Sequence, residues 1–256
     1  MNISIVGYGR MGQMVEKAAN QLNIPIVSKI DPSHPNATHK FFNKESMEQV
    51  DVCIAFSQPD AAYQNILDAC KWKKPLVIAT TGWLDKLDQA REVITKNNNA
   101  VIYSSNFSLG VNLFFALLQK ASKLMNSFPI YDAFVHEFHH RHKKDSPSGT
   151  AKTIGNLLID SMDNKNTIVT ESLSNRSISN DELHISSTRG GEIPGTHSVF
   201  FDSEFDTIEL THRARNRMGF AHGAIHAAEW IQDKKGLFTE KDMIQYFLSK
   251  VDAEDS

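Results

Sequence analysis

Nine consecutive residues near the middle of the chain, 136–144, contain four histidines and three cations. Residues 147–150 (Pro-Ser-Gly-Thr) follow them and precede a run with helical spacing, so they are expected to lie at a helix N-terminus. The first N–H groups of a helix have no acceptor within it and attract anions. Together with the three cations, they suit a small carboxylate ligand. The segment also fits an ordinary helix cap beside exposed lysines.

The same tract contains His136-Glu137-x-x-His140, the spacing of zinc proteases, in which two histidines bind zinc and the glutamate acts as base. That interpretation needs a helix, whereas residues 130–135 are aromatic and β-branched and favour a strand. In a strand the two histidines are about 13 Å apart, too far for one zinc ion. We therefore expect a structural role for His136 and no metal. A structural or nonspecific metal-binding tract is the remaining metal alternative.

Gly7, Gly9 and Gly12 form a G-x-G-x-x-G turn between an apolar run and a helical pattern. In dinucleotide sites the first glycine allows a tight turn, the second lets a pyrophosphate approach the backbone, and the third lets the helix pack closely. Asp31 ends the next apolar run, 19 residues beyond Gly12, where an acid can accept the ribose hydroxyls. The pattern predicts a dinucleotide site. Asp31 also suits a plain turn cap, because Asp-Pro-Ser is favourable turn chemistry.

The elements that position these residues begin with alternating strand and helix patterns. Short apolar runs lie at residues 3–6, 24–30, 52–56, 76–79 and 101–103, and helical spacing at residues 11–22, 61–70 and 84–94. Near-continuous apolar strands alternating with helices indicate a parallel sheet covered on both faces. The N-terminal part is therefore predicted to be an α/β Rossmann domain.

The pattern changes after residue 106. A helical run at 111–125 precedes a strand-like segment at 131–138, and residues 183–212 alternate with a period of two. Helical spacing returns at 218–231 and in a last helix, which Thr239 and Asp242 open as a capping box. We predict a central α+β domain at residues 107–216. Residues 1–106 and 217–256 are predicted to form the Rossmann domain.

The composition excludes several classes of protein. The 256 residues are 41% hydrophobic and 22% charged, as in ordinary globular domains. The formal net charge of -3 offers no basic field for nucleic acid, so none is expected as a partner. No apolar stretch suits a membrane span and the first residues lack a charged signal region, so we expect no membrane association and a cytoplasmic location. Cys53 and Cys70 are expected to be reduced thiols.

At these residues the sequence resembles the dihydrodipicolinate reductase (4-hydroxy-tetrahydrodipicolinate reductase) family of the bacterial and plant lysine pathway. The most specific segment is residues 137–151, EFHHRHKKDSPSGTA. Further matching segments follow in order along nearly the whole chain, at residues 6–12, 80–82, 106–112, 189–191, 197, 211–214 and 220–224. The glycine turn alone would be shared by many oxidoreductases.

The resemblance implies an enzyme that uses NAD(P)H to reduce a cyclic dicarboxylate, 4-hydroxy-tetrahydrodipicolinate, to tetrahydrodipicolinate in lysine and diaminopimelate biosynthesis. It also implies a homotetramer in which the central domain carries the substrate and oligomer contacts. By resemblance, His139 is the general acid and Lys143 a proton donor or carboxylate partner. His140 would orient the substrate, and the amides of Gly149 and Thr150 would hold a carboxylate.

The cofactor residues that the resemblance implies are Gly7, Gly9, Arg10, Met11, Gly12, Asp31, Thr80, Thr81, Gly82, Ser105, Asn106 and Phe107. The chain departs from the family in Ser104-Ser105 and in the lack of an arginine after Asp31. A carboxylate accepts the ribose hydroxyls of NADH but repels the 2′-phosphate of NADPH. Because Lys29 and His34 lie nearby in sequence, we expect NADH preference with measurable NADPH activity.

Two alternatives remain open at this point. The chain could be another Rossmann oxidoreductase acting on a semialdehyde, a sugar or another small carboxylate, although no cysteine lies near the start of the central domain. It could also be a dinucleotide-binding protein without turnover, against which the intact His139, Lys143 and Thr150 argue.

Overall fold

The computed structural model describes residues 1–254, apart from the side chains of residues 251, 252 and 254. The chain divides into two compact units, Met1–Asn112 with Arg217–Ser256, and Leu113–Asn216. The last two residues of the predicted Rossmann range, 255 and 256, lie outside the described residues. Dinucleotide binding by residues 1–106 and 217–256 stays a prediction. Substrate binding and oligomer contacts by residues 107–216 also stay a prediction.

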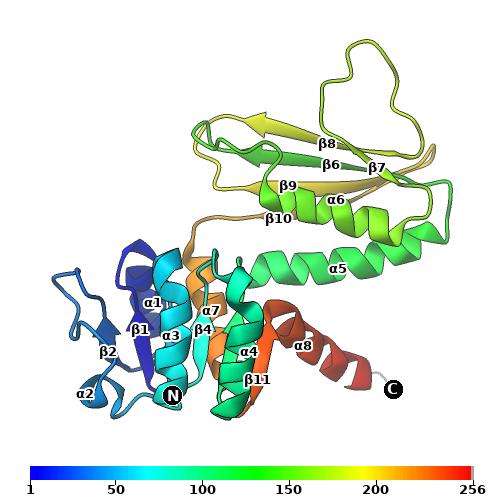
Figure 1. The fold of residues 1–256 in the computed structure, drawn as a ribbon. Coiled ribbons are helices and arrows are strands. Elements are labelled where there is room, and N and C mark those ends of the chain that lie inside the picture. The colour runs from blue at the N-terminus through cyan, green and yellow to red at the C-terminus, as the bar shows by residue number, and fades with distance from the viewer. Residues whose placement is uncertain (255–256) are drawn as a thin grey trace. The chain divides into compact units, whose positions relative to one another are not determined.

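The first unit contains a six-stranded parallel sheet in the order β11-β5-β4-β3-β1-β2 (Figure 1). Its strands are β1 (Ile3–Val6), β2 (Ile26–Ile30), β3 (Val52–Ala55), β4 (Leu76–Ile78), β5 (Ala100–Tyr103) and β11 (Gly236–Thr239). Every residue of β1, β3 and β4 is buried, as the continuous apolar runs predict. The predicted Rossmann-like α/β class is confirmed.

Helices cover this sheet and complete the first unit. They are α1 (Arg10–Gln21), α2 (Lys44–Met47), α3 (Pro59–Lys71), the 3-10 turn η1 (Leu84–Lys86), α4 (Leu87–Lys96), α7 (Met218–Ile231) and α8 (Glu240–Glu254). Helix α7 packs on α1 and contacts β3, β4 and β5, whereas α3 packs on α4 and contacts β3 and β4. Among the described residues, none of the helices is both long and apolar enough to cross a membrane.

Two short elements of this unit have no counterpart in the sequence patterns. Strand β11 has four residues, opens with a glycine and pairs with β5, so its place depends on a distant partner rather than on local periodicity. Helix α2 has four residues and is held by a capping box in which Asn43 and Ser46 exchange hydrogen bonds. The capping box predicted for the last helix is present in part: the Asp242 carboxylate accepts hydrogen bonds from the Thr239 N–H and from the Thr239 hydroxyl.

The second unit contains a five-stranded mixed sheet in the order β10-β9-β6-β8-β7. Its strands are β6 (Asp132–His139), β7 (Thr167–Val169), β8 (Glu182–Arg189), β9 (Thr196–Asp202) and β10 (Thr207–Arg213), and its helices are α6 (Gly149–Ser161) and the greater part of α5 (Leu109–Asn126). One face of the sheet packs on both helices through a core that includes Leu118, Val135, Leu158 and Ile185. The prediction of a second domain that mixes helices and strands is confirmed.

Candidate active site

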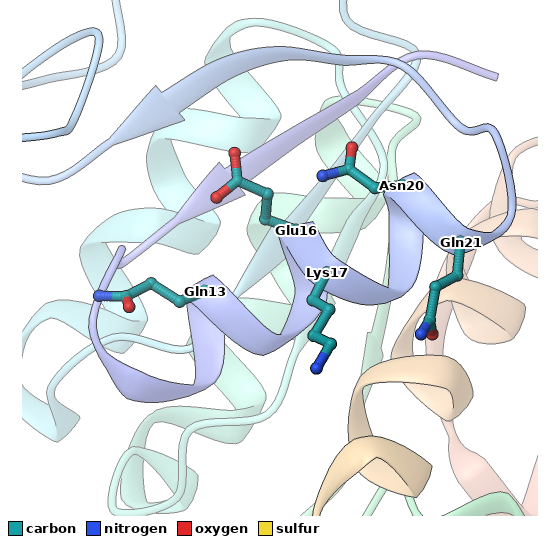
Figure 2. Close-up of a pocket in the computed structure, with 5 residues that line it drawn as sticks. All are labelled: Gln13, Glu16, Lys17, Asn20 and Gln21. Atoms are coloured by element: carbon teal, nitrogen blue, oxygen red, sulfur yellow. The ribbon is translucent and has the colours of Figure 1, made fainter.

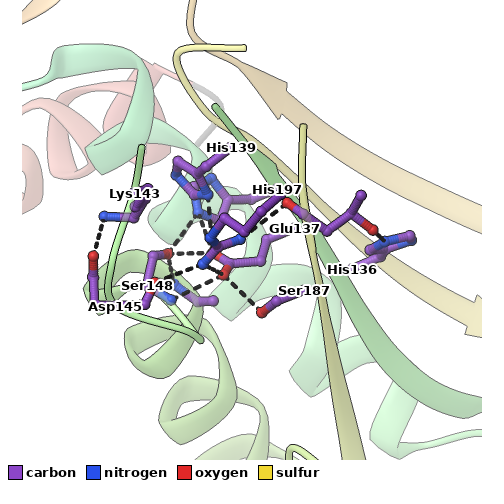
Figure 3. Close-up of polar contacts among 11 residues, drawn as sticks. His136, Glu137, His139, Lys143, Asp145, Ser148, Ser187 and His197 are labelled. Carbon is purple, nitrogen blue, oxygen red and sulfur yellow. Dashed lines mark hydrogen bonds and ion pairs between the residues drawn. The ribbon is translucent and has the colours of Figure 1, made fainter. Parts of the chain in front are cut away.

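A fully buried carboxylate, Glu137 of β6, organises the polar contacts at the carboxyl end of that strand (Figure 3). Its Oε1 accepts hydrogen bonds from the Ser148 N–H at 3.0 Å, the Ser187 hydroxyl at 2.8 Å and the Arg189 guanidinium at 2.8 Å. Its Oε2 accepts a hydrogen bond from the Ser148 hydroxyl. Four donors from two segments of the chain, the start of α6 and β8, therefore converge on one side chain.

Two imidazoles lie against the same carboxylate. His139 Nδ1 and His197 Nε2 are each 3.4 Å from Glu137 Oε2, and the two rings meet edge to face at 5.1 Å. Both side chains are almost fully buried. Glu137 and His139 share a face of β6 because side chains two residues apart in a strand point the same way. The alternation of β6 thus joins the predicted acid to a buried anion.

Strand β6 also decides between the two interpretations of the histidine tract. Because residues 132–139 are a strand, His136 lies on the opposite face from Glu137, as Figure 3 shows. His136 stacks on Phe138 with ring centroids 4.2 Å apart, and its Nε2 lies 3.0 Å from the Thr188 hydroxyl. His136, Glu137 and His140 do not converge as the zinc-protease spacing requires.

Burial lowers the pKa of His139 to about 4. The nearby carboxylate of Glu137 opposes this, and the charges of His197, Lys143 and Arg189 lower the pKa further. Burial works against ionisation of Glu137, but hydrogen bonds from His197, Ser148, Arg189 and Ser187 outweigh it and hold its pKa well below the usual range. In the ligand-free protein at neutral pH, His139 is therefore neutral beside an ionised Glu137.

The predicted anion-binding residues lie at the start of α6. Ser148 is the N-cap and accepts a hydrogen bond from the Ala151 N–H at 3.2 Å. Gly149 is the first helical residue and faces open space, and Thr150 is half-buried. The Ser148 hydroxyl caps the helix, and the Ser148 N–H donates to Glu137. The helix cap and the helix N-terminus that the sequence predicts are therefore both present at these residues.

The cations of the tract lie in different surroundings. Lys143 pairs with Asp145 at 2.8 Å and is half-buried, whereas Arg141 is exposed and lies 3.5 Å from Glu192. Lys144 is exposed. The N–H of His140 donates to the carbonyl of Ile193 at 2.8 Å, and its ring is half-buried. Of the three cations, Lys143 is the one that contributes to the electrostatics of His139.

One group of possible metal ligands occurs among the described residues: Glu137, His139 and His197 offer ligand atoms within 4.8 Å of one another. The carboxylate already accepts four hydrogen bonds and lies beside the Arg189 cation, which disfavours a divalent ion.

We therefore expect EDTA to leave turnover unchanged in an assay of NADH oxidation. Inactivation by EDTA that zinc reverses would contradict this expectation and restore a metalloenzyme interpretation.

The glycine turn of the first unit has the close contacts that a dinucleotide site needs. A Cβ on Gly7, which has φ of +84°, would lie 2.5 Å from the Phe56 carbonyl oxygen, and one on Gly12 would lie 2.2 Å from the Gly7 oxygen. Gly9 is the N-cap of α1, faces open space and has no side chain that could accept a hydrogen bond from the first N–H groups of the helix. Arg10 and Met11 follow as the first helical residues. This arrangement fits a pyrophosphate at the N-terminus of α1.

Asp31 both supports the turn and leaves capacity for a ligand. Its Oδ1 accepts the N–H groups of Ser33 and His34 and the Ser33 hydroxyl, so it does cap the turn that follows β2. Its Oδ2 accepts the Tyr8 N–H at 2.8 Å, which ties the acid to the glycine turn. A carboxylate oxygen accepts about two hydrogen bonds, so Oδ2 has room for a ribose hydroxyl.

The other predicted cofactor residues lie at the carboxyl ends of β4 and β5. Thr80, Thr81 and Ser105 line a cavity of about 220 Å³ together with Trp83, Tyr103 and Lys241, among others. Gly82 lies next to it with φ of +91°. Asn106 accepts from the Ser108 N–H at 2.9 Å, and Phe107 is 2% exposed, so these two side chains shape the loop.

A second hollow, of about 390 Å³, follows the outer face of α1 (Figure 2). Gln13, Glu16, Lys17, Asn20 and Gln21 line it, all from this one helix. None of the predicted site residues lines this hollow. We assign no chemistry to it.

The sequence patterns missed the central role of Glu137 and the contribution of Ser187. The period-two alternation of residues 132–139 was the available signal for Glu137, because it places this glutamate on the face of His139. For Ser187 there was no local signal, since it approaches Glu137 through the pairing of β8 with β6. His197 and Arg189, which the resemblance covered without a role, both contact the carboxylate.

Comparisons with known proteins identify the family. The family model for the N-terminus of dihydrodipicolinate reductase matches residues 1–107, and the model for its C-terminus matches residues 110–244. The 4-hydroxy-tetrahydrodipicolinate reductase of Christiangramia forsetii is 42% identical over 95% of this chain and 98% of that protein. That of Methanoregula boonei is 34% identical over 92% of this chain and 94% of its own.

A solved structure agrees at the level of the fold. Dihydrodipicolinate reductase from Paenisporosarcina sp. TG-14, solved with dipicolinate bound, has a TM-score of 0.74 and 23% identity, covering 93% of this chain and 97% of that one. The two family models together extend over nearly all of the chain, and the resemblance inferred from the sequence is confirmed. This chain belongs to the dihydrodipicolinate reductase family.

Proposed function

We propose that this protein is an NAD(P)H-dependent oxidoreductase that reduces 4-hydroxy-tetrahydrodipicolinate to tetrahydrodipicolinate, in lysine and diaminopimelate biosynthesis. The observation that carries the proposal is the site around Glu137, His139 and Lys143 beside the N-terminus of α6. It combines a proton donor with cations and N–H groups, which a dicarboxylate that gains a proton requires. The curated relatives support the same reaction.

The residues of the second unit have separate tasks in this mechanism. The α6 N-terminus at Gly149 and Thr150, together with Lys143, neutralises a carboxylate, and His140 orients the substrate. His139 is neutral before binding because burial and neighbouring cations lower its pKa. A bound dicarboxylate adds negative charge and favours the imidazolium, so proton uptake accompanies substrate binding. The imidazolium then gives its proton to the carbon that becomes saturated.

The glycine turn, Asp31 and the carboxyl ends of β4 and β5 are the residues that would hold the dinucleotide. These residues fit a dinucleotide because the approach to the Gly9 backbone is open and because the Oδ2 atom of Asp31 can accept a further hydrogen bond. When bound, the nicotinamide supplies the hydride, and the proton comes from the protein. The balance is the loss of the 4-hydroxyl group of the substrate as water, which leaves an unsaturated carbon–carbon bond, and the addition of one hydride and one proton, with the imidazole reprotonated from solvent.

The surroundings of Asp31 support a preference for NADH. Lys29 lies 3.3 Å from Glu16 and His34 Nε2 lies 3.2 Å from Gln13, so both candidate phosphate ligands are already engaged. A 2′-phosphate would meet the negative charge of Asp31 and Glu16. The backbone hydrogen bonds that Asp31 accepts from Ser33, Tyr8 and His34 outweigh its burial, lower its pKa and keep it ionised.

We expect the double variant Asp31→Ser with Pro32→Arg to shift the ratio of kcat/KM values toward NADPH by roughly tenfold or more. It removes one repulsion and adds a guanidinium that can bind a phosphate through two hydrogen bonds. The measurement compares kcat/KM for NADH and NADPH in both proteins. A wild-type enzyme that favours NADPH tenfold would contradict the role given to Asp31.

We further propose a cytoplasmic homotetramer. Large apolar side chains lie exposed on the second unit, and Phe205, in the turn between β9 and β10, is 82% exposed. On β6 and β9, Phe134 stacks on Phe200 at 4.7 Å, and Phe134 is partly exposed. Such a face suits contact with a second copy. A mass by light scattering near that of a single chain would contradict this assembly.

The test of the function is a direct assay. The purified protein is mixed with NADH and enzymatically prepared 4-hydroxy-tetrahydrodipicolinate, and oxidation is followed by absorbance. Substrate-dependent oxidation supports the reductase, whereas NADH binding without turnover supports a non-catalytic dinucleotide-binding protein. Turnover with a semialdehyde or a sugar instead would support another oxidoreductase.

A further inference from the structure

We propose that Glu137 is the positioning residue of the site: its buried carboxylate holds the tautomer of His139, favours the imidazolium during turnover, and orients His197 and Arg189. This inference rests on the proposed function, because it assigns Glu137 a part in the same proton transfer. It gives no direct contact with substrate to Glu137, whose side chain is fully buried.

The direction of the hydrogen bonds around Glu137 follows from the chemistry of the partners. An ionised carboxylate only accepts, so the Ser148 hydroxyl donates its single hydrogen to Oε2. The same hydroxyl lies 3.1 Å from His197 Nε2, and it has no second hydrogen to give. His197 Nε2 therefore carries a hydrogen and donates to the serine, which also accepts from the Ala151 N–H.

The same reasoning fixes the tautomer of His139. Its Nδ1 lies 3.4 Å from Glu137 Oε2 and has no hydrogen-bond partner among the described residues. An atom that faces an ionised acceptor carries the hydrogen in the favoured tautomer. Nε2 is thus the atom that gains and then releases the transferred proton. After release, the neutral ring keeps Nδ1–H toward Glu137.

Gly195 leaves room at that transferring atom. A Cβ on Gly195 would lie 3.0 Å from His139 Nε2, closer than ordinary contact. Any side chain other than hydrogen at position 195 would crowd the proton-bearing edge of the ring. The two edges of His139 are thus distinguished: Glu137 lies at Nδ1 and a glycine lies at Nε2.

Charge explains why a buried anion is required here. The charges of Lys143, Arg189 and His197 all oppose protonation of His139. The carboxylate of Glu137 favours protonation of His139. Arg189 is in turn held by Glu137 Oε1 at 2.8 Å and by the Asp145 carbonyl at 2.6 Å. Asp145 pairs with Lys143. Without Glu137, His139 would face cations alone and Arg189 would lose its carboxylate partner.

The test is the pH dependence of kcat in two variants with opposite expected shifts. Glu137→Gln removes the negative charge at Nδ1, so the alkaline limb of kcat should move to lower pH by about one unit, with kcat about 10- to 100-fold lower. Ser187→Ala removes a donor to Oε1 and leaves the carboxylate more basic. Its alkaline limb should move to higher pH by a few tenths of a unit, with kcat within about threefold of wild type.

Matched controls separate this role from a merely structural one. Ser186→Ala changes the neighbouring residue of β8, whose hydroxyl bonds the Val135 carbonyl instead, and should leave the profile unmoved. Glu137→Asp keeps the negative charge. Its alkaline limb should therefore lie close to that of the wild type and not at the lower pH expected for Glu137→Gln. NADH affinity and the thermal unfolding midpoint are measured for every variant, and if Glu137→Gln does not fold, Ser187→Ala against Ser186→Ala is the deciding comparison.

The outcomes also separate this inference from the proposed function. A wild-type protein without reductase activity contradicts the function itself. An active wild type whose pH profile is unchanged in folded Glu137→Gln, or shifted equally in Ser187→Ala and Ser186→Ala, overturns the role of Glu137 alone. Opposite shifts in the two site variants, with none in Ser186→Ala, support it.

Discussion

Substitution of His139 by Gln is expected to lower kcat by about 100-fold or more while NADH binds normally. Glutamine fills a similar volume and can form hydrogen bonds, but it cannot transfer a proton near neutral pH. The residues proposed to bind the dinucleotide belong to the other compact unit, so the affinity for NADH should not change. The measurement is steady-state kcat together with NADH binding by fluorescence titration.

His136→Gln is the matched control for this prediction. His136 lies in the same strand, three residues away, with its ring on the opposite face and stacked on Phe138. Its replacement should leave kcat within about twofold of wild type. Activity of His139→Gln within threefold of wild type would remove His139 from the mechanism.

Lys143→Ala is expected to reduce kcat/KM for the dicarboxylate by roughly 10- to 150-fold. Loss of a charge-assisted hydrogen bond to a buried anion costs about 1.5 to 3 kcal/mol. Thr150→Val should act in the same direction but more weakly, since it removes the hydroxyl of this half-buried residue and keeps its backbone N–H. Both are measured as kcat and KM for the substrate, with the dissociation constant for NADH as a separate readout.

Lys123→Ala serves as the control, because Lys123 is an exposed lysine of α5 with no part in the site. It should match wild type in every constant. If Lys143→Ala and Thr150→Val also bind and turn over substrate normally, neither of these two side chains holds a carboxylate. Arg189 and His197, which already contact Glu137, would then be the next residues to substitute.

Local patterns were sufficient where neighbouring residues decide the structure. The apolar run at residues 3–6, the glycines that follow it and the helical spacing after them specify the strand, turn and helix of the proposed dinucleotide site without distant partners. The strand at 132–139 was also predictable, because its β-branched and aromatic residues disfavour the helix that a zinc-protease motif needs.

The remainder depended on pairing between distant segments. Strand β11 exists because Gly236–Thr239 pairs with β5, more than 130 residues earlier in the chain. Ser187, Arg189 and His197 approach Glu137 only through the registers of β8 and β9 with β6. A buried glutamate is unfavourable unless such donors surround it, and a one-dimensional pattern carries no record of them. The carboxylate at the centre of the site was therefore recognisable only in three dimensions.

Reductase activity of the wild-type protein, compared with that of His139→Gln, decides whether this chain reduces the dicarboxylate with His139 as the acid. Enzymatically prepared 4-hydroxy-tetrahydrodipicolinate is added to each protein with NADH, and oxidation is followed by absorbance. We expect substrate-dependent oxidation by the wild type and a loss of about 100-fold or more in His139→Gln, with equal NADH affinity. A wild-type protein that binds NADH but shows no substrate-dependent oxidation would contradict the proposed function.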